Sequence, residues 1–133
     1  MRILLIHSDF LKFEVKKKAI NTAEEAGEKE GKAEEALVVF IAVEKPDETN
    51  PDSVKKQLIA NIKDTYQKVD AKSIVLYPYA HLSSNLGSPK LAQQLLADIY
   101  DELRGDFKVL KAPFGWYKSF ELKCKGHPLS ELS

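Results

Sequence analysis

Two segments that begin in the same way constrain the fold of this chain more than any other feature. Asn50-Pro51 and Ser88-Pro89 each place a helix-capping residue directly before a proline, the residue best suited to the first helical turn. Apolar residues then recur at helical spacing, at Val54, Leu58, Ile62, Tyr66 and Val69 in the first segment and at Leu91, Leu95, Ile99 and Leu103 in the second. The pattern predicts two amphipathic helices that each pack one face on a sheet.

Short apolar segments around these helices predict the strands of that sheet. They cover residues 3–6, 37–43, 73–77, 107–112 and 117–124. Residues 11–15 alternate between apolar and charged side chains, which predicts a half-exposed strand in a hairpin with the first, turning at residues 7–9. Residues 21–35 lack large apolar side chains and are expected to form an exposed loop or a frayed helix. The chain is therefore predicted to be a single α/β or α+β domain over residues 1–133, with a mixed β-sheet core and two main helices.

The composition narrows the class of protein. The 133 residues include 20 basic and 20 acidic side chains, and this net charge of zero argues against a protein that grips nucleic acid through overall charge. The single cysteine, Cys124, excludes a disulfide within the chain and favours a reducing compartment. The longest apolar run, residues 36–43, is too short to cross a bilayer, and the N-terminal sequence has no signal-peptide pattern. We therefore expect a cytoplasmic protein without a membrane partner.

One lysine interrupts the apolar face of the last predicted strand. Lys118 is in phase with Trp116, Phe120, Leu122 and Cys124, while polar and charged residues occupy the other face. Burial of an unpaired ammonium group is costly, because desolvation disfavours its charge. The side chain either extends from the sheet rim into water or is a cation held in a cleft to bind a carbonyl, carboxylate or phosphate group. The pattern alone leaves both alternatives open.

The segment YPYAHLSS, residues 77–84, lies between a predicted strand and the second helix, where binding residues are common. It offers the imidazole of His81 and the hydroxyls of Ser83 and Ser84, without a nucleophile-elbow motif. The two serines could equally form a turn before the helix. The histidines and the cysteine are too scattered for a metal motif, and no glycine-rich phosphate loop is present, so we expect neither a metal nor a cofactor.

Three stretches, taken together, resemble a known family. They are MRILLIHSDF at the start, VLYPYAHLSS in the middle and KAPFGWYKSFELKCKGHPLSEL at the end. In order and spacing they resemble the N-terminal editing domain of archaeal threonyl-tRNA synthetases over essentially the whole chain. The resemblance implies a fold similar to that of D-aminoacyl-tRNA deacylases, and a homodimer. It also implies that the remainder of a synthetase acts with this domain, in the same chain or in a separate one.

The same resemblance implies an editing reaction, the hydrolysis of serine wrongly attached to threonine tRNA. Serine lacks one methyl group of threonine, and one methyl group in a pocket is worth only about 1–3 kcal/mol, so a second site is needed to remove serine. A positioned water can suffice for an activated ester, and the 2′-hydroxyl of the terminal adenosine is expected to assist it. Two other functions stay open: a general D-aminoacyl-tRNA deacylase, and a module that binds tRNA or an amino acid without catalysis.

The resemblance assigns roles to single residues of this sequence. It implies that Lys118 holds the seryl group and helps to orient the water, and that His81 binds near the amino acid and the terminal ribose. Tyr117 and Glu131 are expected to complete the pocket. Backbone groups that cradle the adenosine and the α-amino group are expected around Val43, Pro78, Ala80 and Phe114. The partner that these roles imply is the aminoacylated 3′ end of threonine tRNA.

Overall fold

One long strand, β1 (Arg2–Lys18), organises the sheet. In the computed structural model, which describes residues 1–27 and 29–133, β1 pairs antiparallel with β2 (Glu30–Ala42) on one side. On its other side it pairs antiparallel with β5 (Trp116–Cys124) and with the short β6 (Glu131–Leu132). Three of the other strands that the structure describes are therefore placed directly by β1.

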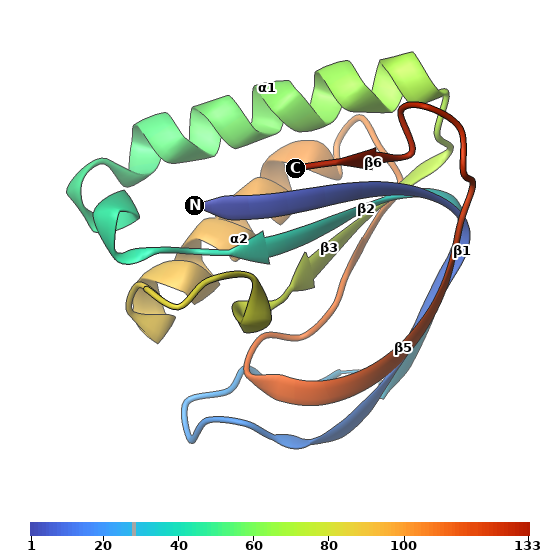
Figure 1. Ribbon diagram of the computed structural model, residues 1–133. Helices are drawn as coiled ribbons and strands as arrows, with labels where there is room; N and C mark the ends of the chain where they lie inside the picture. Colours follow the sequence, from blue (N-terminus) through green and yellow to red (C-terminus); the bar gives the residue numbers. More distant parts are fainter. Residues whose placement is uncertain (28) are drawn as a thin grey trace.

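The remaining strands extend the sheet beyond β2. β3 (Ser73–Pro78) pairs parallel with β2, and β4 (Val109–Lys111) pairs parallel with β3, which gives the order β4-β3-β2-β1-β5 (Figure 1). Two single-turn 3-10 helices, η1 (Lys45–Thr49) and η2 (Ala80–Leu82), follow β2 and β3. The sheet is mixed, and the strands predicted near residues 37–43, 73–77, 107–112 and 117–124 are confirmed as β2 to β5.

The two helices begin where the sequence predicts them. α1 (Pro51–Val69) is capped by Asn50, whose Oδ1 accepts a hydrogen bond from a first-turn backbone N–H at 3.4 Å. α2 (Pro89–Leu103) is capped by Ser88, whose Oγ accepts from a first-turn N–H at 3.2 Å. Both helices pack on the same face of the sheet (Figure 1), against side chains that include Leu37, Val39, Ile41, Ile74 and Leu76. The removal of these apolar side chains from water stabilises the fold, and the two-helix, mixed-sheet class is confirmed. Of the helices that the structure describes, none is long and apolar enough to cross a bilayer.

The predicted hairpin at the start of the chain is wrong, because β1 runs through residues 7–9 without reversing. The polar side chains there find partners inside the fold. Ser8 Oγ donates to the carbonyl oxygen of Ala36 in β2 at 3.1 Å. The β1–β2 pairing skips Asp9 and Glu35, and Glu35 has a left-handed φ of 49°. The strand therefore bends at this point instead of turning, and its second half curls away together with β2 and β5 (Figure 1).

Part of the segment expected as a loop or a frayed helix is also a strand. β2 begins at Glu30, so residues 30–35 extend the ladder with β1. A Cβ atom at Gly31 would lie 2.5 Å from the ring of Phe13 on β1. A small residue is therefore required at this one position to admit the aromatic ring. Residue 28 of the same segment lies outside the described residues.

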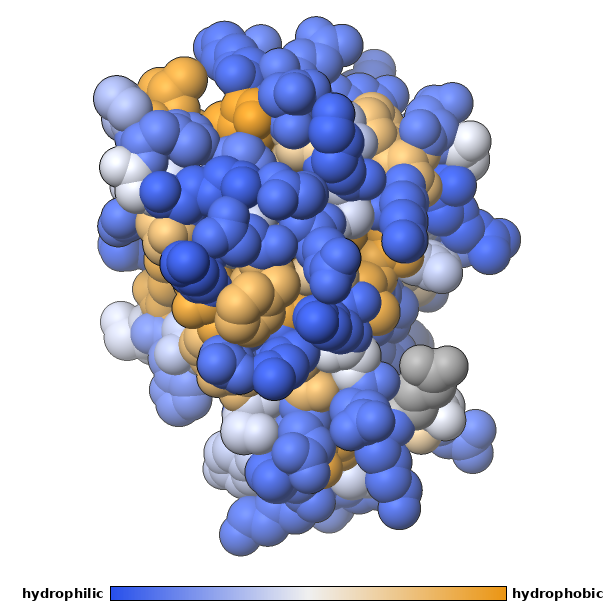
Figure 2. Space-filling view, turned by 90° about the vertical axis from the view of Figure 1, so that its right-hand side faces the viewer, coloured by the Kyte–Doolittle hydropathy of each residue, from blue (hydrophilic) through white to orange (hydrophobic). Residues whose placement is uncertain are grey.

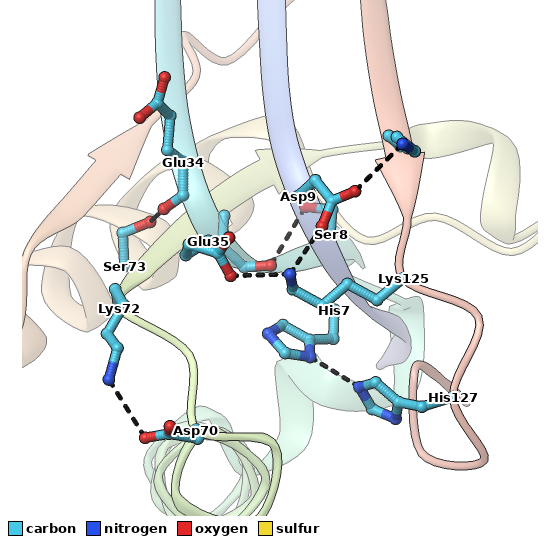
Figure 3. Close-up of polar contacts among 12 residues, drawn as sticks. His7, Ser8, Asp9, Glu34, Glu35, Asp70, Lys72, Ser73, Lys125 and His127 are labelled. Atoms are coloured by element: carbon cyan, nitrogen blue, oxygen red, sulfur yellow. Dashed lines mark hydrogen bonds and ion pairs between the residues drawn. The ribbon is translucent and has the colours of Figure 1, made fainter.

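The loop that follows β5 fastens the bend of β1 (Figure 3). Lys125 Nζ donates to Asp9 Oδ1 at 2.6 Å and pairs with Glu35 Oε2 at 2.8 Å, so it binds both residues that the ladder skips. Beside this ion cluster, His7 Nδ1 and His127 Nε2 are 2.7 Å apart. The C-terminal loop is therefore tied to the middle of the sheet.

The sheet face opposite the helices carries a second apolar cluster. Four rings, those of Phe40, Tyr77, Tyr79 and Phe120, lie in mutual contact with centres 5.2–6.1 Å apart. Phe120 is still 41% exposed. From the side at which β1 bends, apolar side chains appear as patches separated by polar ones (Figure 2). The aromatic cluster forms a floor beside the candidate site.

Candidate functional site

A pocket of about 250 Å³ lies at the carboxyl ends of β2 and β3. Because these strands are parallel, their ends meet at one edge of the sheet, where η2 and the turn before β5 enclose the space. Seven of the eight residues predicted for the site line this pocket: Val43, Pro78, Ala80, His81, Phe114, Tyr117 and Lys118. The fold thus brings together side chains from three separate stretches of the sequence.

Lys118 is half-buried in this pocket rather than extended into water. Its Nζ donates to the carbonyl oxygens of Pro113 and Trp116, each at 2.9 Å, and lies 5.1 Å from the centre of the Tyr77 ring. Burial lowers the pKa of Lys118 to about 8. An ammonium group has three N–H bonds, and the third has no partner among the residues that the structure describes. One N–H is therefore available to a molecule in the pocket.

His81 lines the same pocket from η2. The backbone before it is held to the sheet by the Tyr79 N–H, which donates to the Ile41 carbonyl oxygen at 2.8 Å. The rings of Tyr79 and His81 meet edge to face, with centres 5.3 Å apart. The imidazole itself is exposed, so a bound molecule can reach it.

The hydroxyl of Ser83 forms a turn rather than a nucleophile pair. Ser83 Oγ donates to Glu44 Oε2 at 2.7 Å and accepts from the Asn85 N–H at 3.0 Å. The hydrogen bond from Ser83 is the main cause that lowers the pKa of the Glu44 carboxyl group. Within the described part of the chain, no hydrogen bond joins a serine hydroxyl to His81. Of the two alternatives for this loop, the structure shows the turn, which anchors the loop to the end of β2.

Glu131 is the one predicted site residue that lies elsewhere. It pairs with Ile6 of β1 as part of β6, and its side chain is exposed. Its Oε1 lies 3.6 Å from Cys124 Sγ. Cys124 also stands outside the pocket. β6 and β5 pair with the same side of β1, but Glu131 lies opposite Ile6 and Lys118 lies opposite Val15, nine residues further along β1, so a single copy does not bring Glu131 to Lys118.

Reasoning from the sequence missed Glu24, which holds the turn before β5. Its Oε1 accepts from the Phe114 N–H at 2.6 Å and pairs with Lys111 Nζ at 2.7 Å. Its backbone carbonyl oxygen accepts from Trp116 Nε1 at 2.7 Å. No local pattern distinguishes Glu24 from its neighbour Glu25, because these partners lie about 90 residues away along the chain.

The pocket offers groups that can bind a small ligand through a polar oxygen atom. It offers one ammonium group, one imidazole and aromatic hydroxyls on mostly apolar walls. Among the described His, Cys, Asp and Glu side chains, no group of three or more is arranged to hold a metal ion. The cation is placed to bind an acyl or phosphate oxygen.

Comparison with known proteins gives a match over the full length. The family model described as the archaea-specific editing domain of threonyl-tRNA synthetase matches residues 1–133. Among curated proteins named threonine–tRNA ligase, the chain is 56% identical over 133 residues to that of Methanococcus maripaludis strain C5. It is 55% identical over 135 residues to that of Methanobrevibacter smithii and 52% identical over 136 residues to that of Thermococcus onnurineus. Each alignment covers 100% of this chain and 21–22% of the relative, so the chain spans about a fifth of the length of these relatives.

A solved structure supports the same architecture. The fold is similar to that of the c-Myc DNA Unwinding Element Binding Protein, with a TM-score of 0.67 over 92% of this chain and 91% of that one. The two sequences are 10% identical, so this similarity concerns the fold alone.

Proposed function

The chain belongs to the family of archaea-specific editing domains of threonyl-tRNA synthetase, and from this premise we propose that it hydrolyses the ester that joins L-serine to threonine tRNA. One observation carries the proposal: the ammonium group of Lys118, which has one N–H without a partner among the described residues, lies in a pocket that His81 also lines. A cation on mostly apolar walls suits an ester carbonyl, whose oxygen becomes negative during hydrolysis.

The proposed reaction needs placement and charge stabilisation more than a protein nucleophile. Water adds to the carbonyl carbon of the ester, the carbonyl oxygen takes up negative charge, and the bond to the ribose oxygen then breaks. The leaving ribose oxygen accepts one proton of the water, the other proton passes to solvent, and serine departs with a free carboxylate. The 2′-hydroxyl of the terminal adenosine assists the positioned water. Hydrogen-bond donors that are already positioned to stabilise such an oxyanion increase the rate by about 10²- to 10³-fold.

The seven predicted residues that line the pocket each have a role in this proposal. The third N–H of Lys118 holds the seryl group and helps to orient the water. His81 binds near the amino acid and the terminal ribose. Tyr117, which is 51% exposed at the pocket edge, completes the pocket when substrate is bound. Backbone groups around four further lining residues cradle the adenosine and the α-amino group: Val43, Pro78, Ala80 and Phe114.

Discrimination between serine and threonine is proposed to be steric. Serine enters, whereas the additional methyl group of threonine meets the pocket wall and must displace its atoms. One methyl group is worth about 1–3 kcal/mol, which corresponds to about 10- to 200-fold in rate. That factor multiplies the selectivity of a separate aminoacylating site.

We further propose a homodimer that associates through β5. This strand ends the main path of the sheet, and its Tyr117 and Phe120 side chains are 51% and 41% exposed. Glu131 lies away from its own pocket, so its proposed role requires the pocket of the second copy. Mixed dimers of Lys118→Met and Glu131→Gln chains should then regain activity, because one of their two pockets keeps both side chains. Mixed dimers without activity would contradict a role for Glu131 across the dimer.

The partner proposed for this domain is the remainder of a threonyl-tRNA synthetase, in the same chain or in a separate chain. The relatives are about five times longer than this chain, which supports such a partner. We place both in the cytoplasm.

The proposed reaction is tested with threonine tRNA that carries L-serine, L-threonine or D-serine. The chain should hydrolyse the L-seryl ester at least about tenfold faster than the threonyl ester. Equal rates on the two L-esters, or no turnover of either, would contradict the proposal. A D-seryl rate above the L-seryl rate would instead indicate a general D-aminoacyl-tRNA deacylase. Tight binding of tRNA with no hydrolysis by stoichiometric protein would indicate a binding module.

A further inference from the structure

The turn before β5 is held by the loop that follows β1, a segment distant in sequence. The Ala19 N–H donates to the Gly115 carbonyl oxygen at 2.8 Å, and the Glu24 N–H donates to the Phe114 carbonyl oxygen at 3.2 Å. Gly115 has a φ of +85°, and a Cβ atom there would lie 2.8 Å from Ala23 Cα. The two segments are packed backbone against backbone, as the light-blue loop and the orange turn show in Figure 1.

Glu24 and Lys118 bind the two ends of one peptide group, the group that joins Pro113 to Phe114. Its N–H donates to Glu24 Oε1 at 2.6 Å, and its carbonyl oxygen accepts from Lys118 Nζ at 2.9 Å. A carboxylate on the N–H polarises the peptide and makes its oxygen a stronger acceptor. The contact that directs Lys118 is therefore strengthened by a residue on the far side of the turn.

The charges around this peptide also act on Lys118 directly. Burial lowers the pKa of Lys118, the carboxylate of Glu24 counteracts this effect, and the cation of Lys111 adds to it. Lys111 Nζ pairs with Glu24 Oε1 at 2.7 Å, so the same carboxylate interacts with the charges of both Lys111 and Lys118. Loss of the negative charge of Glu24 leaves the charge of Lys111 unopposed, which disfavours the charged form of Lys118.

We propose that Glu24 is a positioning residue of the candidate site, which holds the turn before β5 and keeps Lys118 charged and directed into the pocket. Glu24 is not among the residues that line the pocket, and its side chain is 28% exposed, so it acts through Lys118 and not on the substrate. The inference rests on the proposed function for the ester that Lys118 binds, and it adds the device that keeps this lysine active.

The direct test is the titration of the Lys118 ammonium group, followed by NMR of lysine side chains in the wild-type chain and in Glu24→Gln. Glutamine keeps an oxygen that can accept from the Phe114 N–H, so the turn is retained while the charge is lost. The pKa of Lys118 should fall by about 0.5–1 unit. This is less than the shift for a direct ion pair, because a peptide group separates the two side chains. The alkaline limb of the deacylation–pH profile should move to lower pH by the same amount.

Two further variants make the test selective. Glu25→Gln is the matched control, since this exposed neighbour has the same chemistry and no contact with the Pro113–Phe114 peptide; it should change neither readout. Lys111→Met removes the competing cation and should move the pKa of Lys118 upward. An unchanged Lys118 pKa in Glu24→Gln, or an equal fall in Glu25→Gln, would overturn the proposal. Should Glu24→Gln not fold, Lys111→Met decides, and an unchanged pKa there overturns the proposal as well.

The titration needs no turnover, so it separates this inference from the proposed reaction. A chain that hydrolyses no aminoacyl ester, but whose Lys118 pKa falls in Glu24→Gln, would contradict the reaction and support the positioning. An active chain whose Lys118 pKa is unchanged in Glu24→Gln would support the reaction and contradict the positioning role of Glu24.

Discussion

The ammonium group of Lys118 lies 5.1 Å from the centre of the Tyr77 ring and is held there by two backbone carbonyl oxygens. Burial raises the pKa of the Tyr77 hydroxyl, so this ring remains neutral at physiological pH. Among the described residues, no carboxylate forms a direct ion pair with Lys118. The carbonyl oxygens and the Tyr77 ring therefore stabilise the positive charge of Lys118 without pairing it with a carboxylate, and it remains available to a negative oxygen of a ligand.

This arrangement predicts how Lys118→Met changes stability with pH. The pKa of Lys118 is about 8 in the fold and 10.5 as the ordinary value, so between these pH values the unfolded chain binds more protons. The unfolding free energy of the wild-type chain should therefore rise over this window, relative to the variant. In urea unfolding, the unfolding free energy of Lys118→Met should exceed that of the wild-type chain by most below pH 8. This difference should disappear above pH 10.5. A constant difference from pH 7 to 10.5 would contradict the burial of this charge. Lys123→Met, on an exposed side chain of the same strand, is the control.

Gly115→Ala should destabilise the fold and disturb the turn that directs Lys118. A side chain at φ +85° costs about 1–2 kcal/mol, and the new Cβ would overlap the backbone of Ala23 as well. Gly105→Ala is the matched control, because Gly105 has open space around it and is not among the residues with positive φ. Urea unfolding at pH 7 should show at least about 1 kcal/mol of loss for Gly115→Ala and about 0.5 kcal/mol or less for Gly105→Ala. Equal losses would contradict the close approach of the two loops.

The His7–His127 pair should make stability depend on pH near neutrality (Figure 3). The Leu129 N–H donates to His127 Nδ1 at 3.1 Å, so a neutral His127 carries its proton on Nε2 and donates it to His7 Nδ1 at 2.7 Å. A proton added to His7 Nδ1 would face the N–H of His127 Nε2, so a charged His7 does not fit this arrangement of hydrogen bonds. Burial, followed by the charges of His127 and Lys125, lowers the pKa of His7 below 6.5, against the opposing carboxylates of Glu35 and Asp9.

The sign of this dependence follows from the lowered pKa. The unfolded chain binds the additional proton at higher pH than the folded one, so the unfolding free energy should fall as pH drops from 7 to 5. The His7→Leu variant should lose this component of the slope, whereas His81→Asn, which leaves the pair intact, should keep it. Denaturant titrations at pH 7, 6 and 5 measure both. A slope that is the same in His7→Leu and in the wild-type chain would contradict the assignment.

The features of the fold that sequence reasoning predicted are those set by neighbours in the chain. Asn50 and Ser88 cap the helices through residues three positions further on, and the apolar spacing behind them is local as well. The polar residues at the bend near Asp9 predict a hairpin turn, but Ser8 and Asp9 bind Ala36 and Lys125, which lie far away in sequence. A polar interruption of an apolar run predicts a turn only when no such distant partner exists.

The candidate site shows the same division. The phase of the last strand indicated Lys118, because a lysine on an apolar face is visible within nine residues, the length of β5. Glu24 gave no such signal, since its importance comes from one peptide group about 90 residues away. Only the resemblance to a family indicates Glu131, because in one copy it lies opposite Ile6 of β1 whereas Lys118 lies opposite Val15, so no local pattern connects it with the pocket.

If the Lys118 ammonium group acts on an aminoacyl ester in the pocket, the Lys118→Met chain should hydrolyse seryl-tRNA much more slowly than the wild-type chain. Rates are measured on threonine tRNA charged with L-serine, for the wild-type chain, for Lys118→Met and for the exposed control Lys123→Met. We expect the rate to fall by about 10²-fold or more in Lys118→Met and to stay unchanged in Lys123→Met. A folded Lys118→Met chain that removes serine as fast as the wild type would contradict this expectation.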